Sequence, residues 1–174
     1  MNFREQLRHN LQGDVVVVGI GNPCRGDDAA GSRIAQQISA APGVHVIDAQ
    51  EVPENYLSQI ADEHPDTVVL IDCVDMRSAP GSVALFESGQ TVAYWPSTHR
   101  VPMSLLVDYL KRTTRARILL IAIQPQQTGF VAPMSAEVLS SVASIADLLN
   151  DVFAARSVSA SSEPAYPQRG EMPA

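Results

Sequence analysis

Residues 15–31, VVVVGIGNPCRGDDAAG, contain a strand, a loop and the start of a helix. The four valines form a short apolar, β-branched run, which is typical of a buried strand. Glycine and proline in the following GIGNP segment, residues 19–23, indicate a loop. Residues 29–40 then show helical periodicity, with Ile34 and Ile38 on one face. A strand that leads through a loop into a helix is the first unit of an α/β fold, so we expect that class.

The same alternation of strand and helix patterns continues along the chain. It implies a three-layer αβα architecture, in which a mainly parallel, five-stranded twisted sheet carries helices on both faces. In such sheets, ligands bind beyond the carboxyl ends of the strands. The predicted strands are 14–18, 44–47, 67–71, 82–86 and 117–123, and the predicted helices are 29–40, 53–63, 102–112 and 135–150.

The length of 174 residues fits a single domain. We expect residues 1–153 to form it and residues 154–174 to be a disordered tail, because the composition becomes rich in serine and proline from about Ala155. The hydrophobic runs are too short to span a membrane, and the polar N-terminus lacks the pattern of a signal peptide. A cytoplasmic protein without membrane insertion is therefore expected.

Charge and cysteine content argue against several kinds of partner and site. The chain has a net charge of −7 and a single lysine, which disfavours nucleic acid because phosphate contacts need clustered Lys and Arg. Cys24 and Cys73 lack the spacing of a structural zinc site. Cys24 and His99 could pair as a thiol nucleophile and its base, but no residue that would orient Cys24 is evident.

Three polar segments fall at the expected ligand-binding edge. In the first, Asp27 and Asp28 start a helix, and we expect Asp27 to cap it, which leaves Asp28 to act as a ligand. In the second, Asp72 ends a hydrophobic strand, where a carboxylate is costly unless it is paired, hydrogen-bonded or bound to metal. Asp75, further along, is expected to form a cap or a turn. In the third, His99 lies in the loop before a helix.

These residues suit a metal better than a nucleotide. Residues 19–31 lack both the glycine pattern of a dinucleotide fingerprint and the Gly-Lys-Ser/Thr of a phosphate loop. Two carboxylates and one imidazole suit a borderline divalent ion such as Zn²⁺ or Ni²⁺, and three protein ligands leave positions open for substrate or water. The sequence therefore predicts a metal site formed by Asp28, Asp72 and His99, with either aspartate as a candidate general base.

Several segments, in this order along the chain, resemble the hydrogenase maturation endopeptidases. The resemblance extends from about Val15 to Asn150, and its Gly-Asp-Asp and Pro-Glu-Asn forms are most similar to the branch that processes hydrogenase 3, the formate-hydrogenlyase type. The segments are GIGNPCRGDDAAG at 19–31, PEN at 53–55, LIDCVDM at 70–76 with PG at 80–81, STHRVP at 97–102, and AIQP at 122–125 with GF at 129–130.

This resemblance implies an endopeptidase that removes a short C-terminal peptide from the precursor of a nickel-iron hydrogenase large subunit, after nickel has been inserted. It also implies that the acidic residue, the aspartate and the histidine with which the family contacts metal correspond to Asp28, Asp72 and His99. Nickel would then be supplied by the substrate protein, and Zn²⁺ or Cd²⁺ could occupy the site adventitiously. Cleavage would be direct hydrolysis assisted by the metal.

Two other functions fit parts of the sequence. A non-catalytic nickel-sensing chaperone or docking protein could use the same three residues without turnover. A peptidyl-tRNA hydrolase has an opening motif similar to residues 19–23, but those enzymes bind tRNA through a strongly basic surface, which this acidic chain lacks.

Overall fold

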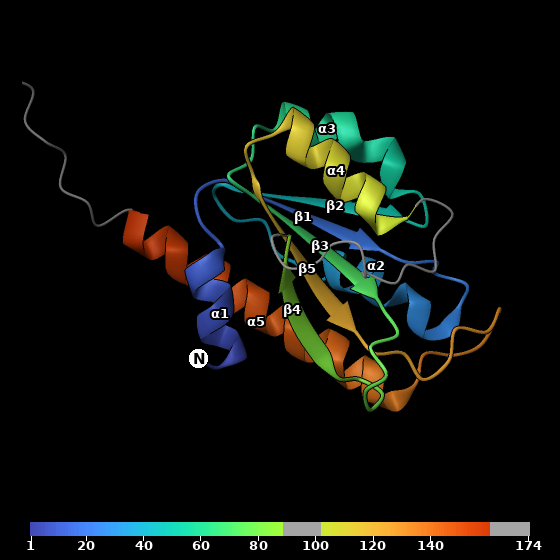
Figure 1. The fold of residues 1–174 in the computed structure, drawn as a ribbon. Coiled ribbons are helices and arrows are strands. Elements are labelled where there is room, and N and C mark those ends of the chain that lie inside the picture. The colour runs from blue at the N-terminus through green and yellow to red at the C-terminus, as the bar shows by residue number, and fades with distance from the viewer. Residues whose placement is uncertain (89–101, 161–174) are drawn as a thin grey trace, which may run out of the picture.

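The computed structural model describes residues 1–88 and 102–160. The strands in these residues are β1 (Val15–Ile20), β2 (Val44–Gln50), β3 (Thr67–Cys73), β4 (Val83–Glu87) and β5 (Arg117–Ile123). They form a five-stranded sheet in the order β2-β1-β3-β5-β4 (Figure 1). The first four strands in this order are parallel, whereas β4 runs antiparallel to β5 at the edge. The predicted mainly parallel sheet is confirmed.

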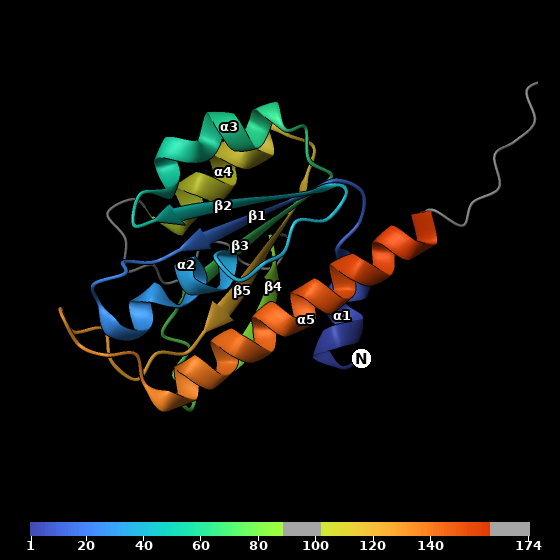
Figure 2. The ribbon, with the colours of Figure 1, turned by 180° about the vertical axis from the view of Figure 1, so that it is seen from behind.

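Helices cover both faces of the sheet, as predicted (Figures 1 and 2). On one face lie α1 (Phe3–Asn10), α2 (Ala30–Ala35) and α5 (Ala136–Ala160), and on the other lie α3 (Leu57–Asp62) and α4 (Met103–Thr113). Two short 3-10 helices, η1 (Gly26–Ala29) and η2 (Pro53–Tyr56), precede α2 and α3.

The run of four valines in β1 is explained by burial on both faces of the sheet. Val15 and Val17 pack into the core beneath α1, α2 and α5, whereas Val16 and Val18 pack into the core beneath α3 and α4. Successive side chains of a strand point to opposite faces, so a central strand needs apolar residues at every position. Each fully buried valine contributes about 1.5–3 kcal/mol relative to an exposed one.

The helix predicted at 29–40 is shorter in the structure, because its first residue belongs to η1 and α2 ends at Ala35. Asn150 of α5 holds the chain that follows: its Oδ1 accepts the Ser39 N–H at 2.8 Å, and its Nδ2 donates to the Gln37 carbonyl oxygen at 3.0 Å. The helix predicted at 53–63 consists of η2 followed by α3, with a proline in the first turn of η2.

The last helix corrects the predicted end of the domain. Residues 154–160 continue α5, where the sequence predicted a disordered tail, and residues 161–174 lie outside the described residues. The serine-rich sequence stays helical here because Val152 and Phe153 are buried in the core and Arg156 donates to the Gly13 carbonyl oxygen.

α5 is also apolar enough to resemble a membrane span. Within its 22-residue segment Ala136–Ser157, an 18-residue window has a mean hydropathy of 1.4, which exceeds what the short hydrophobic runs of the sequence suggested. One stripe of the helix packs against the sheet, so core burial accounts for this hydropathy. The buried residues of the stripe include Val138, Val142, Ile145, Leu149 and Phe153.

Candidate active site at the carboxyl edge of the sheet

Asp28 and Asp72, the two predicted carboxylate ligands, are both buried at the carboxyl edge of the sheet. Asp72 is the second-last residue of β3 and has no exposed surface. Asp28 lies in η1, directly after the loop that follows β1, and is 4% exposed. Because β1 and β3 are parallel neighbours, their carboxyl ends bring both segments to one edge.

Two glycines allow this close approach. Ile71 is the residue before Asp72, and a Cβ at Gly31 would lie 2.0 Å from its carbonyl oxygen. α2 can therefore lie directly on β3 only because Gly31 has no side chain. Gly21 has a φ of +143°, and a Cβ there would lie 1.8 Å from the Asp28 carbonyl oxygen. Gly21 in the loop and Gly31 in α2 therefore allow close packing of the loop, η1, α2 and β3, a structural role that needs no bound nucleotide.

Asn22 orients Asp28 and connects it to the neighbouring loop. The Asn22 backbone N–H donates to Asp28 Oδ2 at 3.0 Å, and the Asn22 Oδ1 accepts the Cys24 N–H at 2.9 Å. The Asn22 Nδ2 donates to Glu51 Oε2 at 2.6 Å. Neither Asn22 nor Glu51 was predicted from the sequence as part of the site. The signal that would have revealed Glu51 is its position just after β2, at the same edge of the sheet.

Asp72 lies beside a buried thiol. Its Oδ1 accepts the Cys73 backbone N–H at 2.7 Å. The pKa of the Cys73 thiol is raised well above its usual range, first by burial and then by the negative charges of Asp72, Asp28 and Asp27. Cys73 therefore stays protonated and is not a nucleophile. Asp72, Asp28 and Asp27 therefore all contribute negative charge in the surroundings of this thiol.

The sequence predicted that Asp27 caps its own helix, and this prediction is wrong. Its buried carboxylate accepts the backbone N–H groups of Gln126, Gln127 and Ser135 at 2.8, 2.9 and 2.6 Å, and the Ser135 hydroxyl at 2.9 Å. Burial by itself would raise the pKa of Asp27, but these hydrogen bonds outweigh it and lower the pKa. Asp27 thus joins η1 to the loop between β5 and α5.

A second polar contact fixes the loop after β3. Gln124, at the end of β5, is buried, and its Oε1 accepts the Met76 N–H at 2.7 Å and the Ser78 N–H at 3.2 Å. The predicted turn at Asp75 is confirmed, since its Oδ1 accepts the Arg77 N–H at 3.0 Å and the Gln124 Nε2–H at 3.1 Å. These bonds lower the pKa of Asp75.

The third predicted ligand, His99, lies outside the described residues, and so does its alternative pairing with Cys24. Within residues 1–88 and 102–160, no group of three His, Cys, Asp or Glu side chains is arranged to hold a metal ion. The structure therefore brings Asp28 and Asp72 to one edge, and the three-residue site stays a prediction.

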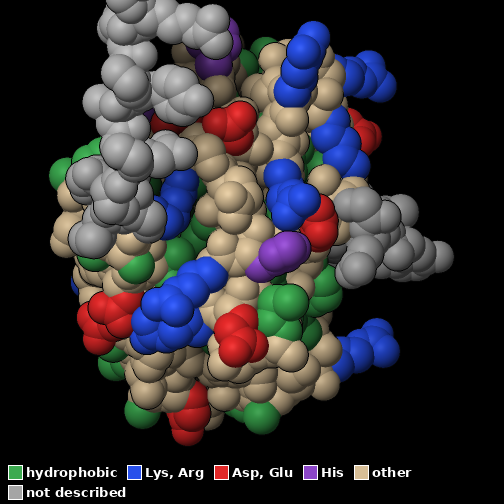
Figure 3. All heavy atoms as spheres, turned by 90° about the vertical axis from the view of Figure 1, so that its left-hand side faces the viewer, with side chains coloured by type: hydrophobic (Ala, Val, Ile, Leu, Met, Phe, Trp, Pro, Cys, Tyr) green, Lys and Arg blue, Asp and Glu red, His purple; other side chains and the backbone are tan. Residues whose placement is uncertain are grey.

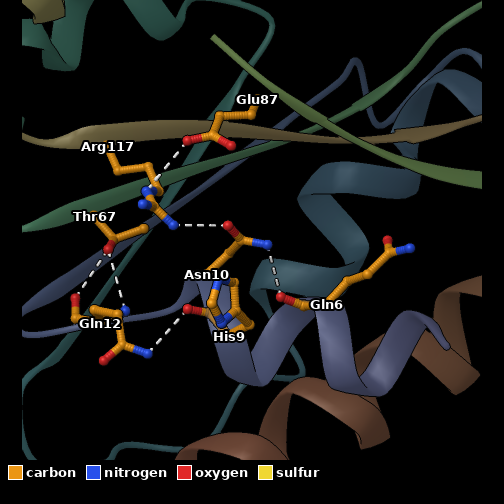
Figure 4. A network of polar contacts seen from close by, with 7 residues as sticks. All are labelled: Gln6, His9, Asn10, Gln12, Thr67, Glu87 and Arg117. Carbon is orange, nitrogen blue, oxygen red and sulfur yellow. Dashed lines mark hydrogen bonds and ion pairs between the residues drawn. The ribbon is translucent and has the colours of Figure 1, made fainter. Parts of the chain in front are cut away.

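The opposite, amino edge of the sheet is closed by structural contacts (Figure 4). Arg117 contacts Glu87 at 3.3 Å and donates to Asn10 Oδ1 at 2.8 Å, while the Thr67 hydroxyl donates to the Gln12 carbonyl oxygen at 2.9 Å. These contacts join α1 to β4 through Arg117 of β5, and join the loop after α1 to β3. The face at this edge carries Lys and Arg side chains interspersed with Asp and Glu (Figure 3).

Comparison with known proteins identifies the family. The family model of hydrogenase maturation proteases of the HycI type matches residues 29–151, which is most of the chain. The chain belongs to the hydrogenase maturation protease family. The matched residues begin directly after Asp28 and include Asp72 and His99. As a member, the protease is a hydrolase of peptide bonds, and the predicted family is confirmed.

Relatives of this protease come from archaea and bacteria. It is 30% identical over 148 residues to a putative hydrogenase maturation protease of Methanocaldococcus jannaschii, covering 78% of this chain and 87% of that protein. It is also 30% identical over 133 residues to the hydrogenase 3 maturation protease of Escherichia coli K12, covering 75% and 85%. The crystal structure of the NiFe hydrogenase maturation protease HycI from Thermococcus kodakarensis superposes with a TM-score of 0.79 and 30% identity, covering 86% of this chain and 99% of that one.

Proposed function

We propose that this protease removes the C-terminal peptide from the nickel-loaded precursor of a nickel-iron hydrogenase large subunit, with Asp28, Asp72 and His99 as its metal-contacting and catalytic residues. The observation that carries the proposal is the burial of Asp28 and Asp72 at the carboxyl edge of the sheet in a member of this family. The relatives named for hydrogenase 3 maturation support a hydrogenase precursor as the substrate.

The carboxylates fit a divalent cation carried by the substrate. Asp28 and Asp72 are both buried at the carboxyl edge of neighbouring parallel strands, where low dielectric strengthens the repulsion between like charges. A divalent cation would offset that repulsion, and carboxylates with an imidazole suit Ni²⁺ and Zn²⁺. Nickel held by the substrate would supply Lewis-acid polarisation of the scissile carbonyl or a water of lowered pKa.

The surrounding backbone fixes the oxygens that would take part. The Asn22 N–H holds Asp28 Oδ2, and the Cys73 N–H holds Asp72 Oδ1. Groups held in place before the substrate arrives need no reorganisation during the reaction, which lowers the barrier. Either carboxylate is a candidate general base for the attacking water.

The proposal is tested by processing of purified, nickel-loaded precursor, read by mass spectrometry, with nickel-free precursor as the substrate control. Asp28→Asn, Asp72→Asn and His99→Ala should each lower the rate at least about a hundredfold, because losing a metal contact removes several kcal/mol of assistance. Circular dichroism should show an unchanged fold. Cleavage by His99→Ala near the wild-type rate would contradict the three-residue site.

The alternative, a nickel-sensing docking protein, predicts binding of precursor without turnover. A multiple-turnover assay with precursor in excess separates the two, because only a protease releases more product than there is protein. Membership in a family of proteases favours turnover.

A further inference from the structure

A groove opens on the side of the site formed by the first loop, α2 and α5. Its volume is about 400 Å³. Gly26 and Ala29, which flank Asp27 and Asp28 in η1, contribute to one wall, so the groove adjoins the 3-10 helix that contains Asp28. The remaining wall is largely apolar and includes Pro133, Met134, Leu139 and Val142.

Apolar side chains project beside this groove without burial. Leu139 is 54% exposed, and Phe130 and Val131, in the loop that leads into the groove wall, are 73% and 76% exposed. Val131 has a φ of +61°, which is a strained conformation for a β-branched residue. Its N–H donates to the Cys24 carbonyl oxygen at 2.7 Å, so this exposed tip is held against the first loop. Exposed apolar residues around a groove are typical of an interaction site.

The charges around the groove are positive although the chain is acidic. Arg33 lines the groove, and Arg25 directly precedes Gly26, which also lines it. Both arginines are exposed, and neither forms an ion pair with a carboxylate in the described residues. With a net charge of −7 for the whole chain, two unpaired arginines beside an apolar groove favour a partner segment that is apolar and carries a carboxylate.

We propose that this groove is the docking site for an apolar, carboxylate-bearing segment of the precursor, outside the residues that are cut. The inference rests on the proposed function, because that function supplies the partner. Phe130, Val131 and Leu139 would anchor the segment, and Arg33 would pair with its carboxylate. Docking here holds the partner against η1, which also contains Asp28, so it contributes to substrate affinity and not to the chemical step.

The test compares KM and kcat for processing of purified, nickel-loaded precursor by Phe130→Ser, Leu139→Ser and Arg33→Glu. Each should raise KM at least about tenfold and leave kcat within about twofold, because the lost contacts are made equally in bound substrate and transition state. Leu105→Ser is the matched control, since Leu105 is 57% exposed on α4, which covers the other face of the sheet. Arg112→Glu controls for the change of charge.

Each outcome decides the inference. An unchanged KM in all three variants, or an equal rise in both controls, would overturn it. If wild-type protein does not cleave the precursor, the proposed function fails, and titration calorimetry with the precursor then tests the groove directly. Binding that is weakened by Leu139→Ser supports the docking site, whereas absent binding, or binding that Leu139→Ser leaves unchanged, overturns it. If Leu139→Ser instead converts a dimer to a monomer in sedimentation of the protein alone, a second copy occupies the groove and the inference is wrong.

Discussion

At the residue scale, four donors converge on the carboxylate of Asp27. Asn cannot replace Asp there, because its NH₂ group would face an N–H or O–H donor instead of accepting from it. We expect Asp27→Asn to lower the free energy of unfolding by about 2–4 kcal/mol, as for loss of buried hydrogen bonds to a charged group. Ser135→Ala, which removes the hydroxyl but keeps the backbone N–H, should cost about 1 kcal/mol. Chemical denaturation measures both.

Because the pKa of Asp27 is lowered, the difference in stability between wild type and Asp27→Asn should depend on pH. A carboxyl group with a lower pKa when folded stabilises the protein above its unfolded pKa and loses that contribution as the pH falls through its folded pKa. The gap in stability between wild type and Asp27→Asn should therefore be constant at neutral pH and shrink below the ordinary value of 3.8. A gap that is independent of pH down to acid unfolding would contradict the hydrogen-bonded carboxylate.

Asn22 provides a second prediction at this scale, because it orients Asp28 without being a proposed ligand. Asn22→Ala removes the side-chain contacts to Cys24 and Glu51, so the backbone N–H that holds Asp28 loses its support. We expect kcat to fall about tenfold with little change in KM, as for loss of about 1.4 kcal/mol of transition-state stabilisation. Glu51→Gln keeps an acceptor for the Asn22 Nδ2 and is the matched control. Equal losses in both variants would show that the charge of Glu51 matters more than the positioning.

At the scale of elements, the placement of α2 depends on Gly31. Gly31→Ala would put a methyl group 2.0 Å from the Ile71 carbonyl oxygen, and backbone cannot yield as a flexible side chain does. We expect destabilisation by about 3 kcal/mol or more, with η1 displaced from β3 and loss of processing. Gly129→Ala is the control, because its Cβ would lie at an ordinary 3.5 Å from the Ala132 side chain. Thermal unfolding compares the two, and equal melting temperatures would contradict the close packing.

Elements differ in how far local sequence predicts them. The positions of β1, β3 and β5 were predicted to within a few residues, because their apolar runs are set by burial on both faces. The ends of α2 and α5 were not predicted correctly, since α2 ends at Ala35 and α5 at Ala160. α2 ends early where Asn150 binds the chain after it, and the contact from Asn150 to Ser39 spans 111 residues. No local pattern carries that information.

At the scale of the whole molecule, α5 is long enough to connect the two edges of the sheet. Its first turns adjoin the loop that binds Asp27, and Arg156, near its other end, donates to Gly13 before β1. We expect a chain that ends at residue 160 to melt within about 1 °C of the full-length protein. A chain that ends at residue 153 should lose about 1–2 kcal/mol, because it lacks the Arg156 contact and the last turns of the helix. Equal stability of the two truncations would place the end of the fold at residue 153, as the sequence predicted.

The sequence by itself determined the fold class, the central strands and the position of Asp72 at a strand end, because strand burial and the parallel edge follow from local apolar patterns. It also placed Asp28 at the start of a helix. Only the tertiary structure decided that Asp27 binds the loop before α5 across as many as 108 residues and that Asn22 joins Asp28 to Glu51. It also decided that Gly31 lets α2 lie on β3 and that Gly21 lets the loop after β1 lie against η1. Those features depend on which segments meet in space, and hydrogen-bond partners distant in the chain leave no periodicity in the sequence.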